Sequence, residues 1–178
     1  MHSQKLVPGT IFPSFSIKTI DHGEIIVGKP DGCWELLIVY RGKHCPLCRR
    51  YFHALHDMIP HFNDINVNVI AVSSDPQDRA VAFKREGQYD NITIGYELPL
   101  QQMHILGLYI SDPRSPEETH WPFPEPGLFV IRPDHRLQIV DISNAPFSRP
   151  DIGLIYNGIK FIQENEYPIR GLHDYVDV

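Results

Sequence analysis

The sequence lacks any apolar run of about 20 residues, the length that a helix needs to cross a bilayer. It also lacks a surplus of positive charge, because 16 Lys and Arg residues stand against 22 Asp and Glu, for a net charge of −6. A general nucleic-acid binder needs such a surplus for its phosphate contacts. The opening segment "MHSQKLVPGTIFPSF" has no apolar region of the secretory type. We therefore expect no membrane, no nucleic-acid partner and a cytoplasmic location.

Cysteine is scarce as well: the chain has three, too few for the disulfide framework of a small secreted domain. Two of them, Cys45 and Cys48, lie close together within "YRGKHCPLCRRYF" (40–52). Cations or potential cations surround this pair: Arg41, Lys43, His44, Arg49 and Arg50. In an intracellular chain, such a pair is typically catalytic or metal-binding.

The hydrophobic pattern predicts alternating strands and helices. We expect strands at 35–40, 67–75 and 91–98, helices from Pro46 to near Pro60, at 76–88 and at 100–108, a proline-rich loop at 109–127, and a closing helix at 149–162. Turn residues predict one hairpin within 14–28 and another over 128–143. This order predicts an α/β fold in a single domain spanning 1–178, with a central mixed sheet flanked by helices and an N-terminal β-hairpin.

Cys45 falls at the predicted junction between a strand and a helix. The free N–H groups and the positive dipole end of the helix meet there, and both favour a thiolate. A Cys-x-x-Cys at a helix start commonly lowers the pKa of the first thiol from roughly 8.5 to between about 3.5 and 7.5. The surrounding cations favour the same change, whereas Cys48 lies almost one turn further on and is better shielded. We therefore interpret Cys45 as a nucleophile and Cys48 as a resolving or buried partner.

Two other interpretations of the pair stay open. The segment "CPLCRRYFHALH" supplies four zinc-ligand types in Cys45, Cys48, His53 and His56, although structural zinc sites usually draw their second ligand pair from a separate element. Alternatively, the two cysteines serve only packing. Cys33, which precedes an apolar strand, is expected to be a passive thiol.

Five segments, in order, resemble the peroxiredoxin-like branch of the alkyl hydroperoxide reductase/thiol-specific antioxidant family, over roughly Phe12 to Phe161. They are "LVPGTIFPSFSIKTIDHGEII", "LLIVYRGKHCPLCRRY", "VIAVSSDPQDRAVAFKRE", "QMHILGL" and "PGLFVIRPDHRLQIV". The resemblance implies a thioredoxin-like fold, and by position it carries the nucleophilic cysteine of the family onto Cys45.

Two departures from the family pattern affect the chemistry. Typical peroxiredoxins have Thr or Ser three residues before the nucleophile, where this chain has Gly42, and an arginine where it has Pro126. Those two groups orient the peroxide and stabilise charge on the breaking O–O bond, a role that Arg41 could take from the loop. In thioredoxin-like proteins the position of Pro126 often holds a cis-proline that faces the cysteine pair. We therefore predict a cis bond between Glu125 and Pro126, packed against that pair.

The resulting site hypothesis comprises Cys45, Cys48, Arg41 and Pro126, with no cofactor and no metal. In a peroxidase route Cys45 reduces a peroxide and Cys48 resolves the sulfenic acid. In an exchange route Cys45 attacks a protein disulfide. Both routes need a thioredoxin- or glutaredoxin-like reductant, and the resemblance adds a homodimer as a further expectation. A zinc-binding or redox-sensing module is the alternative from a different functional class.

Overall fold

The computed structural model describes residues 6–173, which form a mixed sheet of seven strands in the order β2-β1-β5-β4-β3-β8-β9. The strands are β1 (Phe15–Thr19), β2 (Gly23–Val27), β3 (Trp34–Val39), β4 (Val67–Val72), β5 (Thr93–Tyr96), β8 (Gly127–Ile131) and β9 (Leu137–Ile142). β4 runs parallel to β3 and β5, and the other neighbours in the sheet are antiparallel. The predicted mixed sheet and N-terminal hairpin are confirmed.

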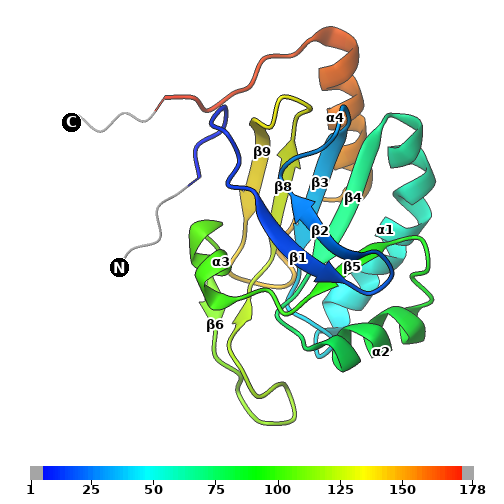
Figure 1. Cartoon of the computed structure of the whole chain (residues 1–178), viewed down its shortest axis with the longest axis vertical. Coiled ribbons are helices and arrows are strands. Elements are labelled where there is room, and N and C mark those ends of the chain that lie inside the picture. Colours follow the sequence, from blue (N-terminus) through cyan, green and yellow to red (C-terminus); the bar gives the residue numbers. More distant parts are fainter. Residues whose placement is uncertain (1–5, 174–178) are drawn as a thin grey trace.

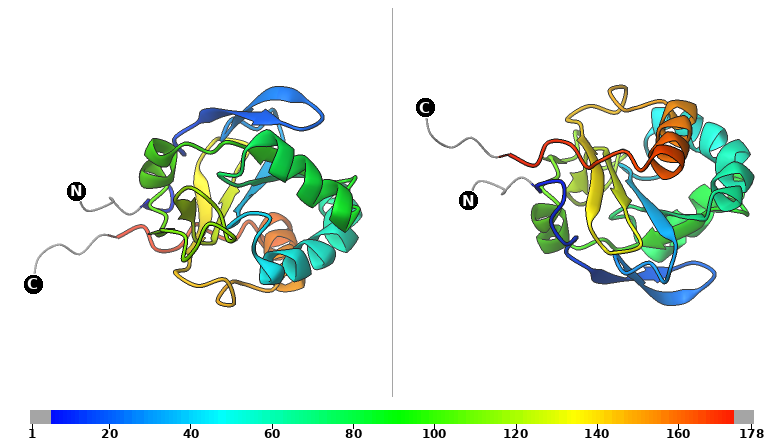
Figure 2. Two further views of the ribbon diagram at one scale, coloured as in Figure 1. Left: turned by 90° about the horizontal axis from the view of Figure 1, so that it is seen from below. Right: turned by 90° about the horizontal axis from the view of Figure 1, so that it is seen from above.

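Helices cover both faces of this sheet, as Figure 1 shows and the views of Figure 2 repeat. The described helices are α1 (Pro46–Asp64), α2 (Gln77–Gly87), α3 (Leu100–Ile105) and α4 (Ile152–Asn165). Side chains alternate across β3, so that Leu36 and Ile38 face the core under α1, α2 and α4, while Leu37 and Val39 face the core under α3. This two-sided burial explains why β3 is a continuous apolar run.

An aromatic cluster lies under the start of α1. Tyr40, Phe52, Phe83 and Tyr89 are fully buried, and their ring centroids lie 4.7 Å (Tyr40–Phe52), 5.0 Å (Tyr40–Phe83) and 5.4 Å (Phe52–Tyr89) apart. Truncating one such ring to alanine costs about 3–5 kcal/mol. The segment that carries the cysteine pair therefore rests on a closely packed aromatic core.

Two segments differ in detail from the prediction. α1 continues past Pro60 to Asp64, because the His56 carbonyl, which loses its helical donor to the proline, accepts a bond of 3.0 Å from Nδ2 of Asn91. The proline-rich loop 109–127 also contains the short antiparallel pair β6 (Ile110–Ser111) and β7 (Phe123–Pro124). This pair holds the loop next to the cysteine-bearing segment.

The predicted domain of 1–178 extends at both ends beyond the described residues. Within the described range, the C-terminal segment reaches the N-terminal one, where a Cβ at Gly9 would meet Leu172 at 2.4 Å. No helix between residues 6 and 173 is long and apolar enough to span a membrane.

Candidate active site

Cys45 is the N-cap residue of α1 and lies just beyond the carboxyl end of β3. Its backbone is extended, Pro46 occupies the first turn of the helix, and its Sγ accepts a hydrogen bond of 3.3 Å from the backbone N–H of Cys48. A side chain at the N-cap faces the unpaired N–H groups of the first turn, which is why a sulfur atom here is well placed to carry negative charge. The predicted position of Cys45 at the helix start is confirmed.

The loop before Cys45 is held by a buried carboxylate. Asp75, which follows β4, accepts a bond of 2.6 Å from the backbone N–H of Lys43 and one of 3.2 Å from Nε of Arg79. Gly42 has a φ of +126°, and a Cβ at that position would lie 2.8 Å from both Asp75 carboxylate oxygens. The departure at Gly42 therefore has a physical reason, since this loop has no room for a threonine or serine side chain.

The surroundings of Cys45 lower its pKa to about 6. The largest cause is the hydrogen bond from the Cys48 side chain, which outweighs the opposing effect of burial. The backbone of Cys48 and the positive charge of Arg41 lower the pKa further. At neutral pH, Cys45 is therefore largely a thiolate.

Cys48 has the opposite character. It is fully buried, and burial raises its pKa well above the usual value, as does its hydrogen bond to the Cys45 sulfur. In the reduced protein, the Cys48 thiol is therefore the donor and the Cys45 thiolate the acceptor. The predicted division into an acidic first thiol and a shielded second thiol agrees with this geometry.

Most of the predicted cations are not among the main influences on the pKa of Cys45. Nζ of Lys43 and Nη2 of Arg49 each pair with Glu86 at 2.7 Å. Burial lowers the pKa of His44 to about 4, so that its ring is neutral at pH 7 and packs edge-on against Phe123, with a centroid distance of 4.6 Å. The prediction that His44 acidifies the nucleophile was wrong, because its ring is uncharged at pH 7. Lys43 pairs with Glu86 and is not among the main influences on the pKa of Cys45.

Arg41 is the cation whose charge lowers the pKa of Cys45, and two glutamate carboxylates share it. Its Nε lies 3.2 Å from Oε2 of Glu125, its Nη2 lies 3.9 Å from Oε1 of Glu118, and its guanidinium lies 4.8 Å from the centroid of the Phe123 ring. Sequence reasoning missed both glutamates, since a proline-rich loop gives no periodic signal. The ion pairs fix where the guanidinium can point.

The prediction of a cis bond before Pro126 was wrong. No peptide bond among residues 6–173 is cis, so the Glu125–Pro126 bond is trans. The Pro126 carbonyl accepts a bond of 3.0 Å from the backbone N–H of Ser143, and its ring lines a small gap with Tyr51 and Arg149. The backbone before Pro126 is held by strand pairing: Pro124 pairs with Ile110 of β6, and the N–H of Glu125 donates to the Tyr109 carbonyl. The family resemblance did not indicate this pairing.

The ligand set of the zinc alternative does not assemble. His53 and His56 lie beside the Tyr89 ring, with centroid distances of 5.3 and 6.5 Å. Nowhere in the described part of the chain do three or more His, Cys, Asp or Glu side chains come together as a metal site. Cys33 is buried beside β4, and its Sγ accepts a bond of 2.9 Å from Nδ2 of Asn68.

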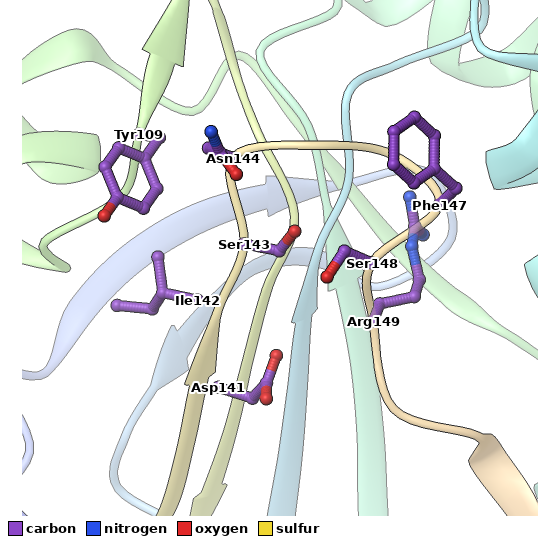
Figure 3. A pocket seen from close by; sticks show the side chains of 8 residues that line it. All are labelled: Tyr109, Asp141, Ile142, Ser143, Asn144, Phe147, Ser148 and Arg149. Carbon is purple, nitrogen blue, oxygen red and sulfur yellow. The ribbon is translucent and has the colours of Figure 1, made fainter.

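Arg149 is a further residue at the pair that sequence reasoning missed. Its Nη2 lies 3.3 Å from Sγ of Cys48, although 101 positions separate the two residues. It also lines a hollow of about 400 Å³ at the end of β9, where Tyr109 and Phe147 stand on opposite sides (Figure 3). Only the tertiary path of the loop between β9 and α4 brings Arg149 to Cys48, so no local pattern could have indicated it.

A thioredoxin-like sheet with an acidic, N-capping cysteine and a second thiol one turn later defines a thiol oxidoreductase. A family model described as the AhpC/TSA family matches residues 8–140, and the chain belongs to that family. No curated protein sequence matches the chain significantly. Family membership supports thiol-dependent peroxidase activity in general, so the protein is a peroxiredoxin-like enzyme.

Solved structures show the same fold. A peroxiredoxin-like protein from Aquifex aeolicus is 18% identical, with a TM-score of 0.75 over 89% of each chain. The reduced 2-Cys peroxiredoxin of Plasmodium vivax is 20% identical, with a TM-score of 0.75 over 90% of this chain and 99% of its own. AhpC of Enterococcus faecalis is 13% identical, with a TM-score of 0.73 over 93% of this chain and 99% of its own. These likenesses confirm the predicted fold class.

Proposed function

We propose that this protein reduces peroxides through Cys45, with Cys48 as the resolving cysteine. The Cys45 thiolate attacks one peroxide oxygen, an S–O bond forms, the O–O bond breaks, and the leaving alkoxide or hydroxide takes up a proton. Cys48 then displaces the hydroxyl group of the sulfenic acid and closes a disulfide. A thioredoxin- or glutaredoxin-like dithiol reduces that disulfide and becomes oxidised in turn.

The observation that carries this proposal is the state of Cys45. Its sulfur receives a backbone N–H at 3.3 Å and a hydrogen bond from the Cys48 side chain, and its pKa is about 6. A thiolate at neutral pH is the form that attacks peroxide. Arg41 is the guanidinium available to stabilise charge on the breaking O–O bond, in place of the arginine that the family has at the position of Pro126.

Burial favours a small substrate over a protein disulfide. Cys45 is 1% exposed and Cys48 is not exposed at all. A peroxide needs only a narrow approach to the sulfur atom, whereas a protein disulfide must bring its own backbone close to it. The trans bond before Pro126 also removes the main residue-level support for pairing with an extended partner peptide.

Exchange with protein disulfides is the second candidate, because a Cys-x-x-Cys at a helix start also suits that reaction. In this second scheme, Cys45 attacks the partner disulfide and Cys48 resolves the mixed disulfide. Pro126 then acts as a wall of the site beside Tyr51 and Arg149 rather than as a cis edge. A redox sensor would use the same two thiols without turnover.

The test is to mix the reduced protein with hydrogen peroxide and, separately, with a protein disulfide, and to follow the formation of the Cys45–Cys48 bond by peptide mapping. Peroxide should oxidise the pair faster, and a thioredoxin-like reductant should sustain turnover. Faster oxidation by the protein disulfide would establish exchange instead. Oxidation without turnover by any dithiol would indicate a sensor.

A further inference from the structure

The arginine at Cys48 differs from the one at Cys45 in how its charge is balanced. Arg41 forms ion pairs with Glu118 and Glu125. For Arg149, by contrast, the structure of residues 6–173 contains no ion pair with a carboxylate. Its Nη1 is buried without a hydrogen-bond partner, whereas its Nη2 donates to Sγ of Cys48 at 3.3 Å. A half-buried cation without an ion-pair partner is costly. Asp141 lines the same hollow but forms no ion pair with Arg149, whereas the sulfur of Cys48 is in direct hydrogen-bond contact with it.

The position of Arg149 is well fixed. Its Nε donates to the Pro146 carbonyl at 3.1 Å, and its guanidinium lies 4.7 Å from the centroid of the Tyr51 ring. The Tyr51 hydroxyl in turn donates to the Pro150 carbonyl at 2.8 Å, which ties the loop after β9 to α1. The guanidinium is therefore held toward Cys48 from both sides.

We propose that Arg149 is a positioning residue that stabilises Cys48 as a thiolate when Cys48 resolves oxidised Cys45. This inference rests on the proposed function only where peroxide is the oxidant. If a disulfide oxidises Cys45 instead, Cys48 resolves the resulting mixed disulfide by the same attack on the Cys45 sulfur. In the peroxide case, the Cys48 sulfur attacks the sulfenic sulfur, an S–S bond forms and the S–O bond breaks. The hydroxide that leaves takes up the proton that Cys48 has lost and becomes water, since Arg149 cannot accept it.

The order of events follows from the groups around Cys48. Before oxidation, the Cys45 thiolate raises the pKa of Cys48 by charge repulsion and by accepting its hydrogen bond, in addition to the effect of burial. When Cys45 becomes a sulfenic acid, its negative charge is gone and both of these contributions disappear. The positive charge of Arg149 and its hydrogen bond, which lower the pKa of Cys48, then oppose burial alone. Cys48 thus stays protonated until the nucleophile has reacted.

The test separates oxidation from resolution in the Arg149→Met and Arg149→Lys variants. Cys45 is oxidised in one arm with hydrogen peroxide, while a dimedone-type probe traps the sulfenic acid. In the other arm, a small aromatic disulfide forms a mixed disulfide on Cys45. We expect both variants to form the first adduct at the wild-type rate. Arg149→Met should close the Cys45–Cys48 bond about tenfold more slowly at pH 7, the effect of a one-unit rise in the pKa of Cys48. Arg149→Lys, which keeps a charge, should fall between the two.

The pH dependence of the rate of Cys45–Cys48 bond closure distinguishes this role of Arg149 from simple anchoring of the loop. The deficit of Arg149→Met should shrink as pH rises, because hydroxide then removes the proton without help. Tyr51→Phe, which loosens the loop but keeps the guanidinium, should leave the midpoint of the profile unchanged. Arg132→Met is the matched control, since Arg132 lies over the Trp34 ring at 5.5 Å, at the other end of β3.

Two results would overturn the inference: closure at the wild-type rate in Arg149→Met, or an equal deficit at every pH. Failure of the proposed function looks different. Wild-type protein that forms no sulfenic acid with peroxide would end the peroxidase proposal, while the arm with the aromatic disulfide would still decide the role of Arg149.

Discussion

The two ends of β3 each hold a buried thiol, and the two thiols have opposite properties. At the carboxyl end, the hydrogen bond from the Cys48 side chain lowers the pKa of Cys45 to about 6, and the backbone N–H of Cys48 and the charge of Arg41 contribute further. At the amino end, burial raises the pKa of Cys33, and the nearby carboxyl group of Glu35 raises it further. Both side chains are less than 10% exposed, at 1% and 7%. The difference lies in the donors and charges that surround each sulfur rather than in solvent access.

At the amino end of β3, Glu35 shows how burial changes the pKa of a carboxyl group that has few hydrogen-bond donors. Glu35 is 3% exposed in the middle of the sheet, and its carboxyl accepts one bond of 2.7 Å, from the backbone N–H of Gly28. Burial raises its pKa to about 7. A helix N-terminus and a second thiol overcome this cost for Cys45, while a single N–H does not overcome it for Glu35. In this protein, the acidic thiol therefore lies at the end of β3 where the chain turns into a helix.

The largest expected effect comes from removing the acidic thiol, Cys45, at the carboxyl end of β3. Cys45→Ser should reduce peroxide consumption to the level of the buffer, because a serine hydroxyl is not ionised at neutral pH. Cys33→Ser is the matched control and should keep full activity, since Asn68 can donate to the new hydroxyl as it does to sulfur. Peroxide consumption coupled to a dithiol reductant measures both variants. Loss of activity in Cys33→Ser would show that the resolving thiol has been assigned wrongly.

Glu35→Gln tests the amino end through stability. The carboxyl binds a proton in the folded state up to about pH 7, whereas in the unfolded chain it releases one near 4.5. The free energy of unfolding should therefore fall as pH rises from 4.5 to 7, by about 3 kcal/mol, and level off above. The glutamine variant, which can still accept the Gly28 N–H, should lack this fall.

Urea unfolding across pH 4 to 8 measures this difference. Glu24→Gln, an exposed change on β2, is the control and should follow the wild type. A fall of equal size in Glu35→Gln would assign the pH dependence to other groups.

Cys48→Ala sharpens the comparison by removing the largest contribution to the acidity of Cys45. In a Cys33→Ser background, where Cys45 is the remaining thiol, the midpoint of alkylation against pH should rise by about one unit or more relative to Cys48→Ser. Serine keeps a hydroxyl donor and alanine does not, while the backbone N–H at position 48 persists in both. Equal midpoints would mean that the backbone and Arg41 alone acidify Cys45.

The sequence was sufficient for features that depend on local pattern. The continuous apolar run of β3, the helical spacing after Pro46 and the turn at Asp21–Gly23 predicted the elements and the place of Cys45 at a helix start. The sequence was insufficient where the local structure or charge depends on a residue far away in the chain. Asn91 lets α1 run through Pro60, Glu86 neutralises Lys43, and Arg149 reaches Cys48 from a loop 101 positions away.

The smallest expected effect concerns the cations that surround the pair in the sequence but do not act on it. Glu86 pairs with Lys43 and Arg49 at 2.7 Å each, and its side chain is 40% exposed. Glu86→Gln releases both cations, yet neither is among the main influences on Cys45. We therefore expect the alkylation midpoint of Cys45 to fall only slightly, and the change to disappear at about 1 M salt, where the Debye length is about 3 Å. Glu97→Gln, which breaks the exposed pair with Lys18 on β1, is the matched control and should give no change at any salt concentration. A large, salt-resistant fall in Glu86→Gln would show that the basic loop acidifies the nucleophile directly, and the contrast between the two ends of β3 would then rest on charge rather than on the helix start and Cys48.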